Sequence, residues 1–153
     1  MEHPNGARSL EEVALCVEDV DSVSMKYSRL LNSTPTFPMT GVAQFKLSKG
    51  KVYIVNPLAL AKWVPGASPP AVPSVFGVGF SVRDLDETKR VLDTNRVVYQ
   101  SHPYPGIWFH PENTGGAGGS FMPSEYSHRL IIYLRLAINH IGLCRPRHPC
   151  LPS

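Results

Sequence analysis

The sequence is poor in cysteine and has no long apolar run. Its three cysteines among 153 residues are an odd number without metal-type spacing, which argues against a disulfide framework and for a reducing compartment. No apolar run reaches the roughly 18 residues that are required to cross a bilayer. The first residues, Met1 to Pro4, have neither the basic stretch nor the apolar core of a secretory signal. We therefore expect a cytoplasmic protein without a membrane partner.

Charge is also sparse, and it is unevenly placed. Charged residues make up 18% of the chain, and the net charge is +3. Residues 126–153 contain four arginines and no acidic residue, so they carry +4, which leaves −1 for residues 1–125. Four arginines dispersed over this stretch, some among apolar side chains, are a poor surface for binding phosphates. We therefore expect no nucleic-acid partner.

Glycine, proline and hydrophobic residues, in contrast, are plentiful. The 12 glycines and 15 prolines favour turns and argue against an all-helical bundle. Hydrophobic residues make up 42% of the chain, which is enough to form a packed core and too many for a disordered protein. The composition therefore predicts an ordered domain that is rich in turns.

The chain contains an internal repeat with an offset of 65 residues. Val13–Asp21 reads VALCVEDVD, and Val78–Asp86 reads VGFSVRDLD. Each copy begins as a short apolar run, which is typical of a buried strand. Each copy then reaches an aspartate that can cap a helix. The repeat therefore predicts two similar units that each begin with a strand and a helix.

The helices are predicted from their caps and from the spacing of their apolar residues. After Asp19 we expect a helix from Val20 to Leu31. The apolar residues on one face of that helix are Val20, Val23, Tyr27, Leu30 and Leu31. Asp84 and Glu87 form a capping box for a second, shorter helix that ends near Asn95.

Three strand-like segments follow each helix, so that each unit reads β-α-β-β-β. In the first unit these segments are Thr36–Met39, Val42–Leu47 and Lys51–Val55. In the second unit they are Val97–Ser101, Gly106–His110 and Gly118–Met122. One such unit leaves one face of its sheet uncovered, and two units side by side can enclose a pocket for a small ligand.

The expected fold is α+β, with two paired β-α-β-β-β modules that form a curved, eight-stranded open barrel with a central cleft. The predicted parts are a flexible N-terminus (1–9), a domain (10–123) made of modules 10–57 and 75–123, a proline-rich extended linker (58–74), and a basic tail (124–153). The tail falls outside the repeat.

Three stretches resemble the vicinal oxygen chelate superfamily, which includes glyoxalase, extradiol dioxygenase and bleomycin-resistance proteins. They are Leu10–Leu31, Lys51–Pro57 (KVYIVNP) and Ile107–Met122 (IWFHPENTGGAGGSFM). The last stretch is most similar to the methylmalonyl-CoA epimerase branch, in which a His-Pro pair precedes a Gly-Gly turn and the final strand. The resemblance implies a glyoxalase- or epimerase-like lyase or isomerase. Such an enzyme acts on a small carbonyl or thioester substrate through an enolate-type intermediate.

The resemblance also implies a divalent metal (Zn, Ni, Co, Mn or Fe) at four positions, which fall here on Glu12, Tyr53, Gly77 and Ser120. Of these, Glu12 is the expected metal ligand. Uncharged Tyr and Ser bind such ions poorly, and glycine has no side chain. The alternatives are therefore a metal-free protein that binds a small molecule and a catalytically inactive interaction module.

Two residues are the catalytic candidates. Glu12 is a candidate general base, because an apolar cleft would raise its pKa; the alternative is a solvated residue at a strand end. His110 is the second candidate, since histidine titrates near neutrality; a role in stabilising a turn is the alternative. The candidate substrate-binding residues are Tyr53, Trp108 and Ser120, and core packing is the alternative for the two aromatic residues. Relatives often pair, so a homodimer is also among the expected assemblies.

Overall fold

The two halves of the sequence repeat fold as two β-α-β-β-β units. The structure is a computed structural model that describes residues 3–64, 66, 68–69, 71–101, 105–114 and 117–126. The first unit comprises β1 (Ala7–Cys16), α1 (Val20–Leu31), β2 (Thr36–Met39), β3 (Val42–Lys46) and β4 (Lys51–Val55). The second comprises β5 (Ser74–Val82), α3 (Leu85–Thr94), β6 (Gln100–Ser101), β7 (Ile107–Phe109) and β8 (Gly118–Pro123).

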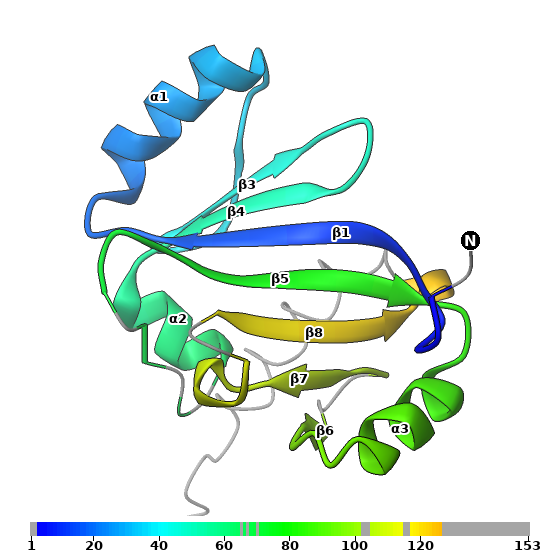
Figure 1. Cartoon of the computed structure of the whole chain (residues 1–153). Helices are drawn as coiled ribbons and strands as arrows, with labels where there is room; N and C mark the ends of the chain where they lie inside the picture. Colours follow the sequence, from blue (N-terminus) through cyan, green and yellow to red (C-terminus); the bar gives the residue numbers. More distant parts are fainter. Residues whose placement is uncertain are drawn as a thin grey trace, which may run out of the picture.

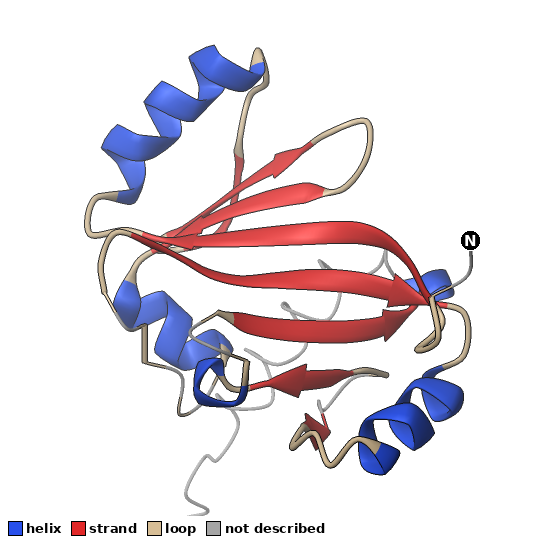
Figure 2. Ribbon diagram, in the orientation of Figure 1, coloured by secondary structure: helices blue, strands red, loops and turns tan. Residues whose placement is uncertain are grey.

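All eight of these strands belong to one sheet, in the order β2-β3-β4-β1-β5-β8-β7-β6. The units meet where β1 runs antiparallel to β5, with Val13 opposite Val78. Within each unit the first strand is parallel to the last, because β1 pairs with β4 and β5 pairs with β8. Equivalent positions of the repeat thus face each other across an approximate two-fold axis. Figures 1 and 2 show that the curved sheet does not close on itself. The predicted α+β open barrel of paired modules is confirmed.

The caps predicted from the sequence begin the two long helices. The Asp19 carboxylate accepts a hydrogen bond from the backbone N–H of Ser22 at 2.9 Å and caps α1. The Asp84 carboxylate accepts one from the backbone N–H of Glu87 at 3.0 Å and caps α3. Each bond satisfies an N–H group that the first turn of a helix would otherwise leave without a partner.

Helices α1 and α3 pack on the same face of the sheet, near its opposite ends in Figure 1. The core beneath α1 consists of Val17, Val20, Ala43, Phe45 and Ile54. The core beneath α3 consists of Leu92, Ile107 and Phe109. Tyr53 and Trp108 are one residue away from these strand positions. Their side chains therefore point to the other face of the sheet, called the inner face below.

One predicted member of the α1 core is wrong. Leu30 is 76% exposed, although the sequence pattern places it with the inward-facing residues. Successive residues of a helix are rotated by about 100°, and Leu31 takes the position that faces the sheet. Leu30 is therefore turned toward solvent.

The segment between the units contains a third helix, α2 (Pro57–Trp63). The prediction of an extended linker over 58–74 is wrong for this stretch. The Asn56 side chain accepts a hydrogen bond from the backbone N–H of Ala59 at 2.8 Å and so caps the helix. Pro57 occupies the first turn, where its missing N–H group costs nothing. The proline therefore starts the helix instead of preventing it.

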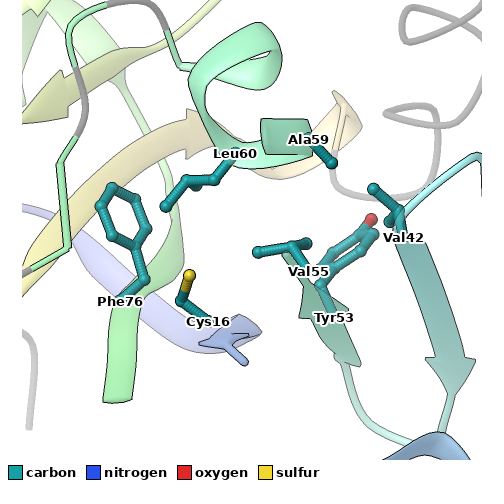
Figure 3. Close-up of a cluster of buried hydrophobic side chains, with 7 residues drawn as sticks. All are labelled: Cys16, Val42, Tyr53, Val55, Ala59, Leu60 and Phe76. Carbon is teal, nitrogen blue, oxygen red and sulfur yellow. The ribbon is translucent and has the colours of Figure 1, made fainter. Parts of the chain in front are cut away.

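Helix α2 closes one end of the inner face. In Figure 3, Leu60 points toward Phe76 and Cys16, while Ala59 lies on the side of Val42 and Tyr53. The buried cluster consists of Cys16, Val42, Tyr53, Val55, Ala59, Leu60 and Phe76. Phe76 belongs to the second unit and most of the others to the first, so that α2 packs against both.

The structured region also extends beyond both ends of the predicted domain, which spans 10–123. Strand β1 begins at Ala7, three residues before the predicted start of the domain, and pairs there with Val82 of β5. Ser124–Tyr126 form a short 3-10 helix, and the rest of the predicted tail lies outside the described residues. Within the part of the chain that the structure describes, every helix is too short or too polar to span a membrane.

Candidate functional site

A cavity of about 120 Å³ lies on the inner face, between the two units and α2. Its walls are mostly apolar and include Leu60, Trp63, Phe76, Trp108 and Met122. The carboxylate and hydroxyl groups among the lining residues belong to Glu12, Tyr53 and Ser120. An engineered cavity of about 150 Å³ in another protein holds benzene. The space therefore suits a small acyl group or a single ring, while the rest of a larger ligand would lie outside it.

The fold brings five of the positions considered in the sequence together around this cavity. Its lining includes Glu12, Tyr53, Gly77, Trp108 and Ser120. The strand register explains why Glu12, Ser120 and Trp108 lie together. Glu12 lies opposite Gly79 on β5, Gly79 lies opposite Ser120 on β8, and Ser120 lies opposite Trp108 on β7. These three residues and Gly79 therefore form one row across four strands.

His110 lies outside the lining of this cavity. It occupies the position before the short 3-10 helix Pro111–Asn113 at the end of β7, without a capping bond from its side chain. Its Nε2 lies 3.1 Å from the backbone oxygen of Gly66, and its ring centroid lies 5.4 Å from that of Trp108. The structure therefore places His110 next to Trp108 and outside the lining that includes Glu12.

The Glu12 carboxylate is buried and is held by Lys51. Its side chain is 9% exposed. The ammonium Nζ of Lys51, which is directly across on β4, donates to Glu12 Oε1 at 3.4 Å. The hydroxyl of Tyr53 lies near enough to this carboxylate to lower its pKa. A buried carboxylate requires such partners, because an isolated charge is costly to remove from water.

A chain of hydrogen bonds leads from the edge of the sheet to Tyr53, beside Glu12. The Thr36 hydroxyl donates to Gln44 Oε1 at 3.3 Å, and Gln44 Nε2 donates to the Tyr53 hydroxyl at 3.1 Å. Because the Tyr53 hydroxyl accepts from Gln44, its own proton is available to the Glu12 carboxylate, whose pKa it lowers. Each bond of the chain polarises the next.

The surroundings shift two pKa values upward. Burial raises the pKa of Glu12, although the Lys51 charge and the Lys51 and Tyr53 hydrogen bonds oppose the shift. Burial, together with the neighbouring Glu12 charge, raises the pKa of Tyr53. Tyr53 therefore remains a neutral phenol that can donate. Glu12 is a carboxylate that accepts a proton more readily than an exposed glutamate.

The raised pKa of Glu12 predicts how stability depends on pH. In the folded protein this carboxyl holds its proton to a higher pH than in the unfolded chain, where its pKa is near 4.5. Its contribution to stability is thus complete below that value and is lost as pH rises through the folded pKa. We expect the free energy of unfolding of the wild type, relative to Glu12→Gln, to fall as pH rises above 4.5 and then to level off. Denaturant unfolding of both proteins at a series of pH values measures this difference, and parallel curves would contradict it.

Two glycines of β5 form the floor of the cavity. A Cβ at residue 77 would lie 2.8 Å from the backbone oxygen of Gly118, so β5 and β8 approach each other too closely for a side chain there. A Cβ at residue 79 would lie 3.0 Å from Ser120 Oγ and 3.5 Å from Glu12 Oε2. The space above Gly79 is therefore the point at which the carboxylate and the Ser120 hydroxyl converge.

Alanine at these two glycines should therefore have different effects. Gly77→Ala should lower the free energy of unfolding by about 1–3 kcal/mol, because rigid backbone must move. Gly79→Ala should have a smaller effect on stability, since side chains can shift, but it should weaken ligand binding by filling the space above residue 79. Chemical denaturation and ligand titration of both variants measure the two effects. Equal losses of stability would contradict this assignment.

The family resemblance implies a metal at Glu12, Tyr53, Gly77 and Ser120, but the groups at these four positions do not fit a divalent ion. Glu12 Oε1 already accepts from the Lys51 ammonium, and the raised pKa of Tyr53 keeps its hydroxyl protonated. Ser120 offers only a neutral hydroxyl, and Gly77 offers no side-chain donor. Among the described residues, no three His, Cys, Asp or Glu side chains lie together as a metal site would require. A typical catalytic zinc site has about three protein ligands.

Two polar residues of the site, Lys51 and Gln44, were not among the candidates from the sequence. Both lie on strands that were predicted, and side chains alternate between the two faces of a strand. Lys51 is two residues from Tyr53 and therefore shares its face. Gln44 lies opposite Tyr53 in the register of β3 and β4. The alternation could have placed both residues on the inner face, but only the register shows that they contact Tyr53 and Glu12.

Comparison with known proteins identifies the fold. No protein-family model and no curated protein sequence matches the chain. Among solved structures, methylmalonyl-CoA epimerase from Mycobacterium tuberculosis superposes with a TM-score of 0.57 at 19% identity, over 81% of this chain and 93% of that chain. The chain has the vicinal oxygen chelate fold. A hypothetical protein from Bacillus halodurans superposes with a TM-score of 0.54 at 17% identity, over 76% of this chain and 94% of that chain.

A third structure with the vicinal oxygen chelate fold contains a ligand. It is a variant of Streptomyces coelicolor methylmalonyl-CoA epimerase in complex with 2-nitronate-propionyl-CoA. Its TM-score is 0.55 at 13% identity, over 77% of this chain and 96% of that chain. Fold relatives thus include isomerase-type enzymes, and at least one of them binds a CoA thioester analogue. At sequence identities of 13% to 19%, the similarity to these structures establishes the fold alone.

Proposed function

We propose that this protein is an isomerase-type enzyme that moves a proton at the carbon next to the carbonyl of a small acyl thioester or a related carbonyl compound. The observation that carries the proposal is the buried Glu12 carboxylate, which has a raised pKa and lines an apolar cavity of acyl-group size. A general base works best when its pKa lies near the working pH. Epimerases of the same fold support the choice of a thioester substrate.

The proposed step requires only side chains of this chain. Glu12 Oε2 removes the proton from the carbon next to the carbonyl. The electron pair of that C–H bond forms the C=C bond of an enolate, and the carbonyl oxygen takes the negative charge. The Ser120 hydroxyl, which lies near the same point above Gly79, donates a hydrogen bond to this oxygen. Such a preorganised donor stabilises the charge as it develops. The enolate carbon is planar, so a proton returned to its other face inverts the configuration, whereas a proton returned by Glu12 to the same face gives exchange with solvent alone.

The other predicted site residues support this step from around the cavity. Tyr53 favours the charged form of Glu12 from beside it, and Trp108 forms a wall against which the acyl group packs. The ring of His110 packs near the ring of Trp108, and its Nε2 lies within hydrogen-bonding distance of the backbone oxygen of Gly66. We therefore assign His110 to positioning Trp108 and not to proton transfer.

Hydrogen–deuterium exchange at the substrate tests the proposal directly. Propionyl-CoA, methylmalonyl-CoA and a hemithioacetal are each incubated with the protein in D₂O and followed by mass spectrometry. We expect deuterium to enter next to the carbonyl of at least one of them, faster than in a sample containing heat-denatured protein. If no compound incorporates deuterium although the cavity is shown to bind it, the enzymatic proposal is wrong.

A second candidate function is the sequestering of a small apolar or aromatic molecule. It is favoured by the walls of the cavity, to which both tryptophans of the chain, Trp63 and Trp108, contribute. A bound ligand should therefore change the intrinsic tryptophan fluorescence. Saturable fluorescence changes with planar aromatic compounds, together with no deuterium incorporation into thioesters, would favour the binding protein. If neither deuterium incorporation nor a fluorescence change is seen, the hypothesis that is left is a catalytically inactive interaction module.

A further inference from the structure

We propose that Lys51 is a built-in cation of this site, which favours the charged form of Glu12 and directs its carboxylate at the cavity without a divalent metal. Its ammonium Nζ lies 3.4 Å from Glu12 Oε1, and the two side chains are 7% and 9% exposed. This ion pair is therefore shielded from water and salt, unlike a surface ion pair. The family resemblance implies a metal at these positions, whereas here a side chain supplies the positive charge.

The register of the sheet shows why Lys51 can orient the carboxylate. Glu12 on β1 has Lys51 on one side, across on β4, and Gly79 on the other side, across on β5. Oε1 accepts from the ammonium, while Oε2 lies 3.5 Å from the position that a Cβ of residue 79 would take. One oxygen is thus anchored away from β5, and the other is presented to the space above Gly79, where a substrate carbon would lie.

The Thr36–Gln44–Tyr53 chain completes this arrangement. It ends at the Tyr53 hydroxyl, which lies beside the same carboxylate. Lys51 and Tyr53 are two residues apart on the same face of β4, so both act on Glu12 from that strand. A divalent ion at Glu12 would have to compete with the Lys51 ammonium and with its positive charge. The site is therefore complete with respect to charge before any ligand enters.

The first test replaces the ammonium by an external one. In Lys51→Ala the space left by the side chain should accept propylammonium, which restores the charge next to Glu12. We expect propylammonium to raise the melting temperature of Lys51→Ala by more than equimolar 1-propanol does, and to have no such selective effect on the wild type or on Lys46→Ala. Lys46 is the matched control because it is exposed and lies opposite Lys51 in the register of β3 and β4. Equal effects of the amine and the alcohol would overturn the proposal.

The second test uses the wild-type chain and therefore does not depend on the folding of a variant. Titration with Co²⁺ should give no saturable change in visible absorption or in tryptophan fluorescence, and a chelator should leave ligand binding unchanged. Stoichiometric Co²⁺ binding that quenches the tryptophans, or loss of ligand binding with a chelator, would overturn the proposal.

The catalytic consequence rests on the proposed proton transfer, and its test separates the two. Lys51→Gln should lower the maximal rate of deuterium exchange by about 10- to 100-fold, which corresponds to the loss of one hydrogen bond to a charged group. The KM should change little, and Lys51→Arg should keep most of the rate. If the wild type shows no exchange while propylammonium still selectively stabilises Lys51→Ala, the proposed function fails and the role of Lys51 stands. A full rate in Lys51→Gln would overturn that role.

Discussion

Replacement of Glu12 by glutamine is expected to slow deuterium exchange into the substrate by about 10²- to 10⁴-fold, the usual contribution of a general base. Glutamine keeps the shape of the side chain but cannot take up the proton. The cavity walls remain in place, so ligand binding measured by tryptophan fluorescence should change much less than the rate. Parallel measurements of exchange and fluorescence distinguish these effects.

Two variants of the same strand serve as controls for this result. Glu11→Gln removes the neighbouring carboxylate, which accepts a hydrogen bond from the Ser9 hydroxyl and is not among the residues that line the cavity; its exchange rate should stay close to that of the wild type. Glu12→Asp keeps the charge beside Lys51 but retracts the carboxylate from the cavity, and it should give an intermediate rate. If Glu11→Gln and Glu12→Gln slow exchange equally, Glu12 is not the base.

Replacement of Lys51 by methionine is expected to lower the free energy of unfolding by about 3–5 kcal/mol, because it leaves a buried carboxylate without its charged partner. Methionine has a similar length, so the loss reflects the charge and not an empty space. Both groups of the pair are almost fully buried, at 7% and 9% side-chain exposure, so solvent screening does not reduce the effect. Chemical denaturation with analysis of the midpoint and slope measures it.

The double variant Glu12→Leu with Lys51→Met shows whether the loss comes from the unpaired charge. Removal of both charges from a buried pair is often neutral or even stabilising, so the double variant should be more stable than Lys51→Met alone. The control is Lys46→Met at the exposed neighbouring position, for which a change within about 0.5 kcal/mol is expected. A loss below 1 kcal/mol in Lys51→Met would show that water reaches the pair.

The repeat in the sequence predicted the fold because both of its copies carry the same local signals. Asp19 and Asp84 each stand between an apolar strand and an amphipathic helix, and both form the caps that their positions predict. The antiparallel pairing of Val13 with Val78 then follows from the two-fold relation of the units. Helix α2 was missed because the prolines farther along, from Pro65 to Pro73, were read as an extended linker over the whole segment. The helix ends before them at Trp63, and Pro57 occupies a first turn that tolerates it.

The candidate site was predictable in part. Glu12, Tyr53 and Ser120 were named as site residues because the resemblance places its metal-binding positions on the first and last strands of each unit. All three residues line the cavity. His110 was chosen for its residue type, and the structure places it next to Trp108. Lys51 carries no motif, and its role depends on the cross-strand register with Glu12. A role that arises from a contact across 39 residues of chain has no signature in the local sequence.

The sequence by itself determined the two modules, their helix caps and the strands that carry the inner-face residues, since these depend on neighbours along the chain and on periodicity. Only the tertiary structure decided that Lys51 donates to Glu12 with Tyr53 beside them, that Gly79 leaves room above the sheet, and that α2 closes the cavity. Local propensity acts over a few residues, whereas the charge state and direction of a buried carboxylate are set by whatever the folded chain brings within hydrogen-bonding distance.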